Sequence, residues 1–294
     1  MRSFGECCPC DSALTRTDGK GSCAKHGFAR HVFEAASDRP EMTLRQGTAN
    51  QWMASLELGG DGIEGIMNRT AIITGGASIV GMAITEHLLE GGWSVAIVDS
   101  DQEAAKVAED AFSGEEVLVL PADVSDEDEI DRAFDTVVDT LGLCSALINC
   151  AGIRPEATFE DTSVELLREA LELNLVAPFV AAQAAFARMV DQLAIINIIS
   201  TSALQARRGR AAIAASHAGL RMMTEILALE NLDRPVRVNC IATAGDGSRR
   251  KIWTSTPSRV PGTEEIVGAV SYLLSDAARM VSGQTLVLGS DESD

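Results

Sequence analysis

The chain has 294 residues, which is enough for one large domain or two small ones. Hydrophobic residues make up 46% and charged residues 23%, so a wholly disordered chain is excluded. The net charge of −19 disfavours nucleic acid and anionic membrane surfaces as partners, and no apolar run is long enough to predict a membrane-spanning helix. The scattered cysteines form no disulfide framework, and no signal peptide is evident. We therefore expect a cytoplasmic protein with a small-molecule or nucleotide ligand.

The first 66 residues lack sustained hydrophobic periodicity, and Gly59-Gly60-Asp61-Gly62 is typical of a linker. We expect residues 1–66 to be a disordered N-terminal extension. Four possible metal ligands there have the spacing C-x2-C-x12-C-x2-H: Cys7, Cys10, Cys23 and His26. Because C-x2-H is an unusual half of a zinc site, we expect no metal.

From Met67 onward, short apolar runs alternate with amphipathic helical patterns. The runs predict strands at Ala71–Thr74, Val95–Val98, Val117–Leu120, Ala146–Ile148, Ala194–Ile199, Val236–Ile241 and Thr285–Leu288. Ser125 with Asp128, and Thr162 with Glu165, predict capping boxes that open two of the helices. Strands buried on both faces and alternating with helices indicate a parallel sheet covered on each side. Residues 67–294 are thus predicted to form a single α/β domain with a doubly wound, Rossmann-like parallel sheet.

The turn after the first predicted strand, Thr74 to Gly81, is rich in glycine and leads into a helix. Glycines there allow a tight turn and let a pyrophosphate approach the free N–H groups of the helix. The second strand ends in Asp99, whose carboxylate could accept hydrogen bonds from the adenosine ribose and would repel a 2′-phosphate. Asp123, after the third strand, is placed to meet the adenine. These residues predict a site for NAD.

Several further motifs resemble those of the short-chain dehydrogenase/reductase family over about Arg69 to Gly289. Thr74-Gly75 and Gly81 match its T-G-x-x-x-G-x-G turn, and Asn149-Cys150-Ala151-Gly152 is similar to its N-N-A-G. Further matches are Asn174 in the long central helix, the strand that ends in Ser200, Arg237-Val238-Asn239, and Ser282-Gly283-Gln284-Thr285. The resemblance implies a homodimer or homotetramer.

The resemblance also implies which residues hold NAD. They are Thr74, Gly75, Ser78, Ile79, Gly81, Asp99, Asp123, Val124, Asn149, Ala151, Gly152 and His217. For catalysis it implies Ser200 and Asn174, together with a tyrosine and a lysine. That tyrosine exchanges a proton with the substrate while the lysine lowers its pKa.

The tyrosine and lysine are missing from this chain. Ile213 stands at the tyrosine position and His217 at the lysine position, although the surrounding residues follow the family pattern. The only tyrosine, Tyr272, lies in the predicted helix before the last strand. His217 could serve as the acid or base instead, given an ordinary histidine pKa of about 6.5.

Other departures surround the same pocket. Ile79 replaces the middle glycine of the turn, where a branched side chain would crowd the pyrophosphate or force the turn open. Thr243-Ala244 replaces a Pro-Gly pair, and Leu288 replaces an aspartate. The segment from Gly245 to Gly262, which forms the substrate lid in the family, is short, polar and basic, with Arg249, Arg250 and Lys251.

Three interpretations stay open. The first is an NAD(H)-binding protein of oxidoreductase ancestry without conventional hydride transfer, alone or in a hetero-oligomer with an active relative. The second is an active NAD-dependent oxidoreductase, or a lyase-like enzyme, whose rearranged site uses Ser200 and His217 on a small carbonyl or hydroxyl compound. The third is a scaffold subunit that binds no nucleotide. Likeness of fold cannot choose among them.

Overall fold

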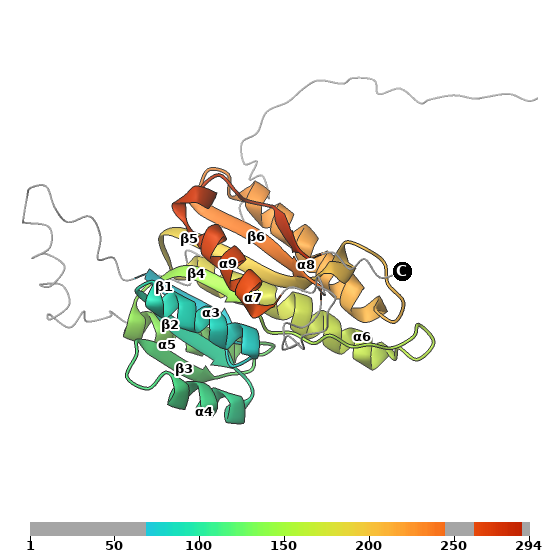
Figure 1. Cartoon of the computed structure of the whole chain (residues 1–294), viewed down its shortest axis with the longest axis horizontal. Coiled ribbons are helices and arrows are strands. Elements are labelled where there is room, and N and C mark those ends of the chain that lie inside the picture. Colours follow the sequence, from blue (N-terminus) through green and yellow to red (C-terminus); the bar gives the residue numbers. More distant parts are fainter. Residues whose placement is uncertain (1–68, 245–261, 290–294) are drawn as a thin grey trace, which may run out of the picture. The chain divides into compact units, whose positions relative to one another are not determined.

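A computed structural model of the chain describes residues 69–244 and 262–289, without the side chains of residues 190 and 191. Its seven strands form one sheet in the order β3-β2-β1-β4-β5-β6-β7 (Figure 1), and each neighbouring pair is parallel. The strands are β1 Arg69–Thr74, β2 Trp93–Asp99, β3 Val117–Pro121, β4 Cys144–Asn149, β5 Met189–Ser200, β6 Val236–Thr243 and β7 Thr285–Leu288. The predicted doubly wound parallel sheet is therefore confirmed.

Helices connect successive strands. They are α3 Ile79–Glu90, α4 Gln102–Ala111, α5 Glu127–Leu141, α6 Val164–Leu171, α7 Ala177–Ala187, α8 Ala211–Glu230 and α9 Thr263–Leu274. A π-helical segment, Glu172–Val176, joins α6 to α7, and 3-10 turns cover Thr201–Ala203 and Asp276–Ala278. The predicted extension over residues 1–66, its zinc pattern and the basic segment with Arg249, Arg250 and Lys251 lie outside the described residues.

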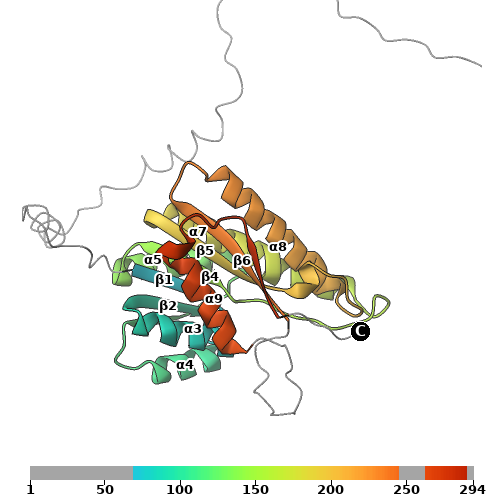
Figure 2. The same cartoon turned by 45° about the horizontal axis from the view of Figure 1, so that its top comes forward.

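The helices cover both faces of the sheet. Helices α3 and α9 lie side by side on one face (Figures 1 and 2), where Ile84 and Ile266 pack against Ile73 and Ile148 of the sheet. Helices α5, α7 and α8 cover the opposite face, with Phe134 fully buried there. Two apolar layers thus enclose the strands, as the uninterrupted apolar strand sequences predict.

Two helices begin one residue later than predicted. Asp126 caps α5 by accepting from the Glu129 N–H at 2.9 Å, whereas the Ser125 hydroxyl is engaged with Asp123. Ser163 likewise caps α6, and its hydroxyl oxygen accepts from the Leu166 N–H at 3.0 Å. The Thr162 hydroxyl is not available as the cap because it donates to the carbonyl of Thr158. The prediction of capping boxes at Ser125 and Thr162 is wrong, because both hydroxyls donate hydrogen bonds to residues that precede them in the chain.

The continuous helix Val164–Ala187 is the one described helix that is long and apolar enough to cross a membrane. Its apolar character has another explanation in the fold. Ala177, Ala181, Ala184 and Ala185 are buried in the core that lies between the helix and the sheet. Small side chains there allow close packing, so the composition reflects burial within the protein.

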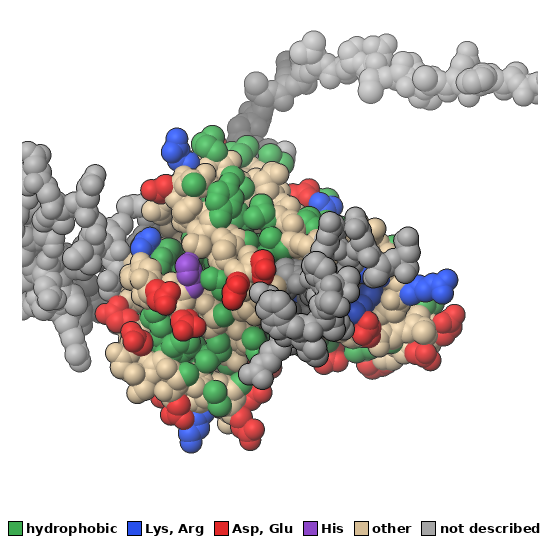
Figure 3. All heavy atoms as spheres, viewed as in Figure 1, with side chains coloured by type: hydrophobic (Ala, Val, Ile, Leu, Met, Phe, Trp, Pro, Cys, Tyr) green, Lys and Arg blue, Asp and Glu red, His purple; other side chains and the backbone are tan. Residues whose placement is uncertain are grey.

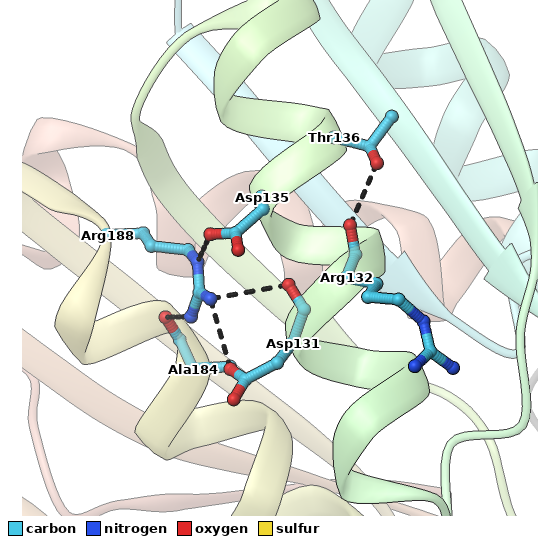
Figure 4. Close-up of polar contacts among 6 residues, drawn as sticks. All are labelled: Asp131, Arg132, Asp135, Thr136, Ala184 and Arg188. Atoms are coloured by element: carbon cyan, nitrogen blue, oxygen red, sulfur yellow. Dashed lines mark hydrogen bonds and ion pairs between the residues drawn. The ribbon is translucent and has the colours of Figure 1, made fainter. Parts of the chain in front are cut away.

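Arg188, directly after α7, ties that helix to α5 (Figure 4). Its Nε donates to Asp135 at 2.8 Å, its Nη2 pairs with Asp131 at 3.0 Å, and its Nη1 donates to the Ala184 carbonyl. Burial opposes the charge, but the hydrogen bonds and charges of the two carboxylates outweigh it and raise the pKa of Arg188. The guanidinium of Arg132, on the same helix as the two aspartates, points away from this cluster (Figure 4).

Candidate active site

The turn between β1 and α3 is closed and rigid. Gly75 has φ +64°, and its N–H donates to the Val98 carbonyl at 2.8 Å. A Cβ on Gly81 would lie 2.5 Å from the Cα of Gly76, so only glycine allows the helix to approach the turn this closely. Ser78 caps α3, accepting from the Gly81 N–H at 3.1 Å and donating to the Gly75 carbonyl at 2.7 Å. The turn therefore presents a helix N-terminus at the edge of the sheet.

Ile79 is the first residue of α3, and 61% of it is exposed. Its side chain points to solvent while the turn keeps its closed hydrogen bonds. Of the two alternatives for Ile79, forced opening of the turn is wrong, because its branched side chain does not enter the space between strand and helix. Crowding of a bound pyrophosphate stays a prediction. Within the described residues, no acceptor contacts the N–H groups of Ile79 and Val80, which remain available to an anion.

Asp99 fastens the end of β2 to this turn. One carboxylate oxygen accepts from the Ala77 N–H at 3.0 Å, and the other accepts from the Asp101 N–H at 3.1 Å. Each oxygen keeps a second lone pair, so the carboxylate can still accept from ribose hydroxyls. Asp99 thus positions the turn, a role that the sequence did not suggest.

Asp123 and Val124 follow β3 at the same edge. Asp123 is exposed and accepts from both the N–H and the hydroxyl of Ser125, at 2.9 and 2.7 Å. Val124 is 5% exposed and belongs to the core on the α5 face. Asp123 therefore fixes the conformation of the surface loop through its hydrogen bonds to Ser125, and Val124 attaches the loop to the core.

Asn149 belongs to a buried row of polar side chains. Its Oδ1 accepts from the Thr74 hydroxyl at 3.1 Å, and its Nδ2 donates to Asn197 at 2.8 Å. Asn197 in turn donates to the hydroxyl of Thr224 on α8 at 2.9 Å. Thr74, Asn149 and Asn197 are register partners on β1, β4 and β5. Thr74, Asn149 and Asn197 thus link β1, β4 and β5 through their side chains. The sequence signal for Asn197 was an asparagine within the apolar run of β5.

Asn174 clamps the loop that follows β4. From the π-helical segment, its Oδ1 accepts from the Ile153 N–H at 2.8 Å, and its Nδ2 donates to the Ile153 carbonyl at 2.9 Å and to Ser216 at 3.0 Å. A Cβ on Gly152 would lie 2.5 Å from Asn174 Oδ1, and one on Gly75 would lie 2.6 Å from Ala151. The loop is therefore held against both the β1–α3 turn and the Asn174 side chain, whose two amide hydrogens are both used in hydrogen bonds.

Ser200 and His217 lie together, one at the end of β5 and the other on α8. The Ser200 N–H donates to His217 Nδ1 at 3.1 Å, and the Ser200 hydroxyl oxygen accepts from the Ser202 N–H. His217 is 4% exposed. Burial and the nearby charge of Arg154 lower its pKa to about 3. The ring is therefore neutral at pH 7, with its proton on Nε2. The expectation of an ordinary histidine pKa is wrong, because it ignored burial.

Comparison with known proteins agrees with the fold. The family model described as short chain dehydrogenase matches residues 69–249. Carbonyl reductase family member 4 of Danio rerio is 31% identical over 76% of this chain and 97% of its own. Glucose 1-dehydrogenase 2 of Bacillus subtilis is 29% identical over 75% of this chain and 93% of its own. The crystal structure of gox2181 superposes with a TM-score of 0.67 at 30% identity, covering 75% of this chain and 94% of that one.

The chain belongs to the short-chain dehydrogenase family. Within that family's pattern, Ile213 occupies the tyrosine position and is fully buried in this structure. Tyr272, the only tyrosine of the chain, lies on α9 and is 41% exposed. The two positions that the sequence analysis aligned with the family's tyrosine and lysine thus hold a buried aliphatic side chain and a buried imidazole.

Arg154 is a site residue that the sequence analysis missed. It lies two residues beyond Gly152, and its Nη2 is 3.4 Å from the hydroxyl of Thr243 at the end of β6. Burial is the main cause of the shifted pKa values of His217 and Cys150, and the charge of Arg154 lowers both. A cation two residues after the N-C-A-G segment was the available signal. In the described part of the chain, no group of acidic, cysteine and histidine residues could hold a metal ion.

Proposed function

We propose that this chain is an NAD(H)-binding member of the short-chain dehydrogenase family that does not carry out conventional tyrosine-dependent hydride transfer. The observation that carries the proposal is the pair of residues on α8. Ile213 is fully buried and has no exchangeable proton, and His217 is neutral with Nδ1 already bonded to Ser200. The usual route for a proton to and from a substrate oxygen is therefore missing.

The retained half of the site supports nucleotide binding. The N–H groups of Ile79 and Val80 open α3, and their partial positive charge favours a pyrophosphate. Asp99 keeps lone pairs for the ribose hydroxyls, and its charge would repel the 2′-phosphate of NADP. The site therefore favours NAD over NADP.

A second candidate is an NAD-dependent oxidoreductase on a small carbonyl or hydroxyl compound. The neutral His217 keeps an Nε2 proton, and the Ser200 hydroxyl can also donate; both could polarise a carbonyl oxygen. The similar proteins named as reductases and dehydrogenases favour this candidate. Loss of activity in both Ser200→Ala and His217→Gln would identify it.

Thermal melting of the full chain with NAD and with NADP tests the proposal. A ligand at 100 times its dissociation constant stabilises the folded state by about 2.7 kcal/mol. We expect a rise of several degrees with NAD, a smaller one with NADP, and no nicotinamide absorbance change with a carbonyl panel. An unchanged melting temperature with both nucleotides would contradict the proposal in favour of a scaffold, and steady turnover would favour the second candidate.

The nucleotide preference has its own test in Asp99→Asn. The amide oxygen can still accept one backbone N–H, but the negative charge is lost, so the NADP shift should approach the NAD shift. Asp101→Asn is the matched control, because Asp101 caps α4 with hydrogen bonds from Glu103 and Ala104. If both variants keep the preference for NAD, Asp99 does not select the nucleotide.

A further inference from the structure

The charged side chains are divided unevenly along the described chain. Residues 69–141, which form β1 to β3 and α3 to α5, contain 17 acidic and three basic residues. The other described residues, 142–244 and 262–289, contain 13 acidic and ten basic residues. With histidine neutral, the first part therefore carries a net charge of −14, whereas the larger remainder carries −3.

The carboxylates of residues 69–141 face solvent. Fifteen of the 17 acidic residues are exposed, and the other two, Asp99 and Glu129, are partly buried. Within the described part of the chain, Arg188 supplies the ion pairs of this segment, to Asp131 and Asp135. Acidic side chains outnumber basic ones over α3 and α4 in Figure 3. The negative charge of this segment is therefore balanced mainly by ions from the solution.

The same segment contains the N-terminus of α3, where we place the pyrophosphate. Asp99 and Asp101 follow β2, and Asp123 and Asp126 follow β3, at the same edge of the sheet. Like charges at this density repel one another and also repel an approaching anion. The range of both repulsions depends on salt, because the Debye length falls from about 30 Å at 0.01 M to about 3 Å at 1 M.

We propose that dissolved salt regulates this part of the molecule. Mobile cations screen the carboxylates of residues 69–141, which stabilises the fold and tightens the binding of an anionic nucleotide. The cations form a diffuse layer, and we assign them no fixed site. The effect on binding rests on the proposed function, whereas the effect on stability depends only on the charges described above. Its direction is opposite to that of an anion site built from basic side chains, where salt weakens binding.

Thermal melting of the full chain without nucleotide tests the effect on stability. Between about 20 and about 500 mM KCl the melting temperature should rise by several degrees, because screening weakens the self-repulsion of the folded state. NaCl should act like KCl, since a diffuse layer does not distinguish the two cations. A rise produced by micromolar MgCl2 at constant ionic strength would indicate a discrete metal site and would overturn the inference.

Charge-reversal variants assign the effect to this segment. Glu109→Lys/Asp139→Lys changes two exposed residues on α4 and α5. It should melt at a higher temperature than the wild type at low salt and gain less from added KCl. Glu160→Lys/Glu230→Lys makes the same change of charge at exposed positions in the remainder of the chain. This control should alter the salt dependence at most half as much.

Calorimetric titration with NAD and NADH tests the effect on binding. NADH carries one more negative charge than NAD, because its nicotinamide ring is neutral. The dissociation constants of both should fall at least threefold between about 20 and about 500 mM KCl, and that of NADH should fall further. A dissociation constant that rises with salt, or that does not change, would overturn this part of the inference.

The outcomes separate this inference from the proposed function. If neither nucleotide binds at any salt concentration while Glu109→Lys/Asp139→Lys reduces the salt dependence of melting, the proposed function is contradicted and the effect on stability is supported. If NAD binds equally at all salt concentrations and melting does not depend on salt, the proposed function stands and this inference is overturned. Equal changes in the two double variants would also overturn it, because the effect would then follow net charge alone.

Discussion

At the residue scale, His217 is the side chain whose surroundings most change its chemistry. Burial and the charge of Arg154 lower its pKa from 6.5 to about 3, and its Nδ1 accepts from Ser200. A neutral imidazole whose Nδ1 accepts a hydrogen bond can donate one from Nε2, but with this pKa it does not act as a general acid or base at pH 7. At pH 7 the buried ring of His217 therefore carries no positive charge.

This pKa shift predicts a pH dependence of stability. Between pH 6.5 and about 3 the unfolded chain protonates His217 while the folded chain does not, so folding becomes less favourable as the pH falls through 6.5. The free energy of unfolding should fall by up to about 1.4 kcal/mol per pH unit more in the wild type than in His217→Gln. Urea denaturation at pH 7.5, 6.0 and 5.0 measures this difference. Parallel profiles for the two proteins would show that His217 titrates normally in the fold.

At the element scale, single polar side chains fix how neighbouring segments meet. Asn174 joins the π-helical segment to the loop after β4 and to α8, with three hydrogen bonds. Arg188 joins α5 and α7 on the same face of the sheet. Both side chains join elements that lie far apart in the sequence. Each therefore restricts the movement of one element relative to another.

Asn174→Ala should destabilise the fold by about 2–4 kcal/mol, because Ile153 loses two partners in a partly buried place. The measurement is chemical denaturation. Asn231→Ala is the control, since this buried asparagine lies at the end of α8 and donates to Leu227. A loss in Asn174→Ala no larger than that of the control would show that the clamp contributes little.

Arg188→Ala should lower the free energy of unfolding by about 1–2 kcal/mol, because its carboxylate partners are largely exposed and solvent screens the pairs. Arg132→Ala, on the same helix as the two aspartates but pointing away from them, should change it by less than about 0.5 kcal/mol. Urea denaturation compares the two variants. Similar losses in both would argue that helix propensity or net charge, and not the tie between helices, explains the effect.

At the scale of the whole molecule, two helices on the same face of the sheet contribute an exposed apolar surface. It comprises Phe179 on α7 and Met222, Ile226 and Leu229 on α8, which are 43 to 68% exposed. Both helices cover the same face of the sheet, and the α8 residues follow helical spacing along one side. Exposed apolar side chains of this size are typical of a subunit interface. We propose that the surface pairs two copies of this chain.

Light scattering with size-exclusion chromatography tests this pairing. The wild type should elute as a dimer or tetramer, and the double variant Phe179→Glu/Leu229→Glu should elute as a monomer, because paired copies would bury four unpartnered charges. Val107→Glu, which changes an exposed apolar residue on α4, should leave the assembly intact. A monomeric wild type, or an unchanged oligomer in the double variant, would contradict the proposed interface.

The sequence predicted the sheet well because its strands are buried on both faces and therefore read as uninterrupted apolar runs. It placed Ser200 and His217 near each other through the family resemblance. It missed the pKa of His217 and the position of Arg154, because both depend on groups brought together by folding. It also placed two helix caps one residue early. The hydroxyls of Ser125 and Thr162 donate to Asp123 and to the Thr158 carbonyl, and residue spacing does not reveal these hydrogen bonds.

The polar row across the sheet has a consequence for how the molecule assembles. Thr74, Asn149 and Asn197 lie directly opposite one another on three parallel strands, and their side chains satisfy one another only in that alignment. A slip of β4 by one residue would turn its amide toward the other apolar layer and leave a buried polar group without a partner. Misaligned sheets would thus be less stable while they form, so the row favours the native register of β1, β4 and β5, whatever reaction the finished site performs.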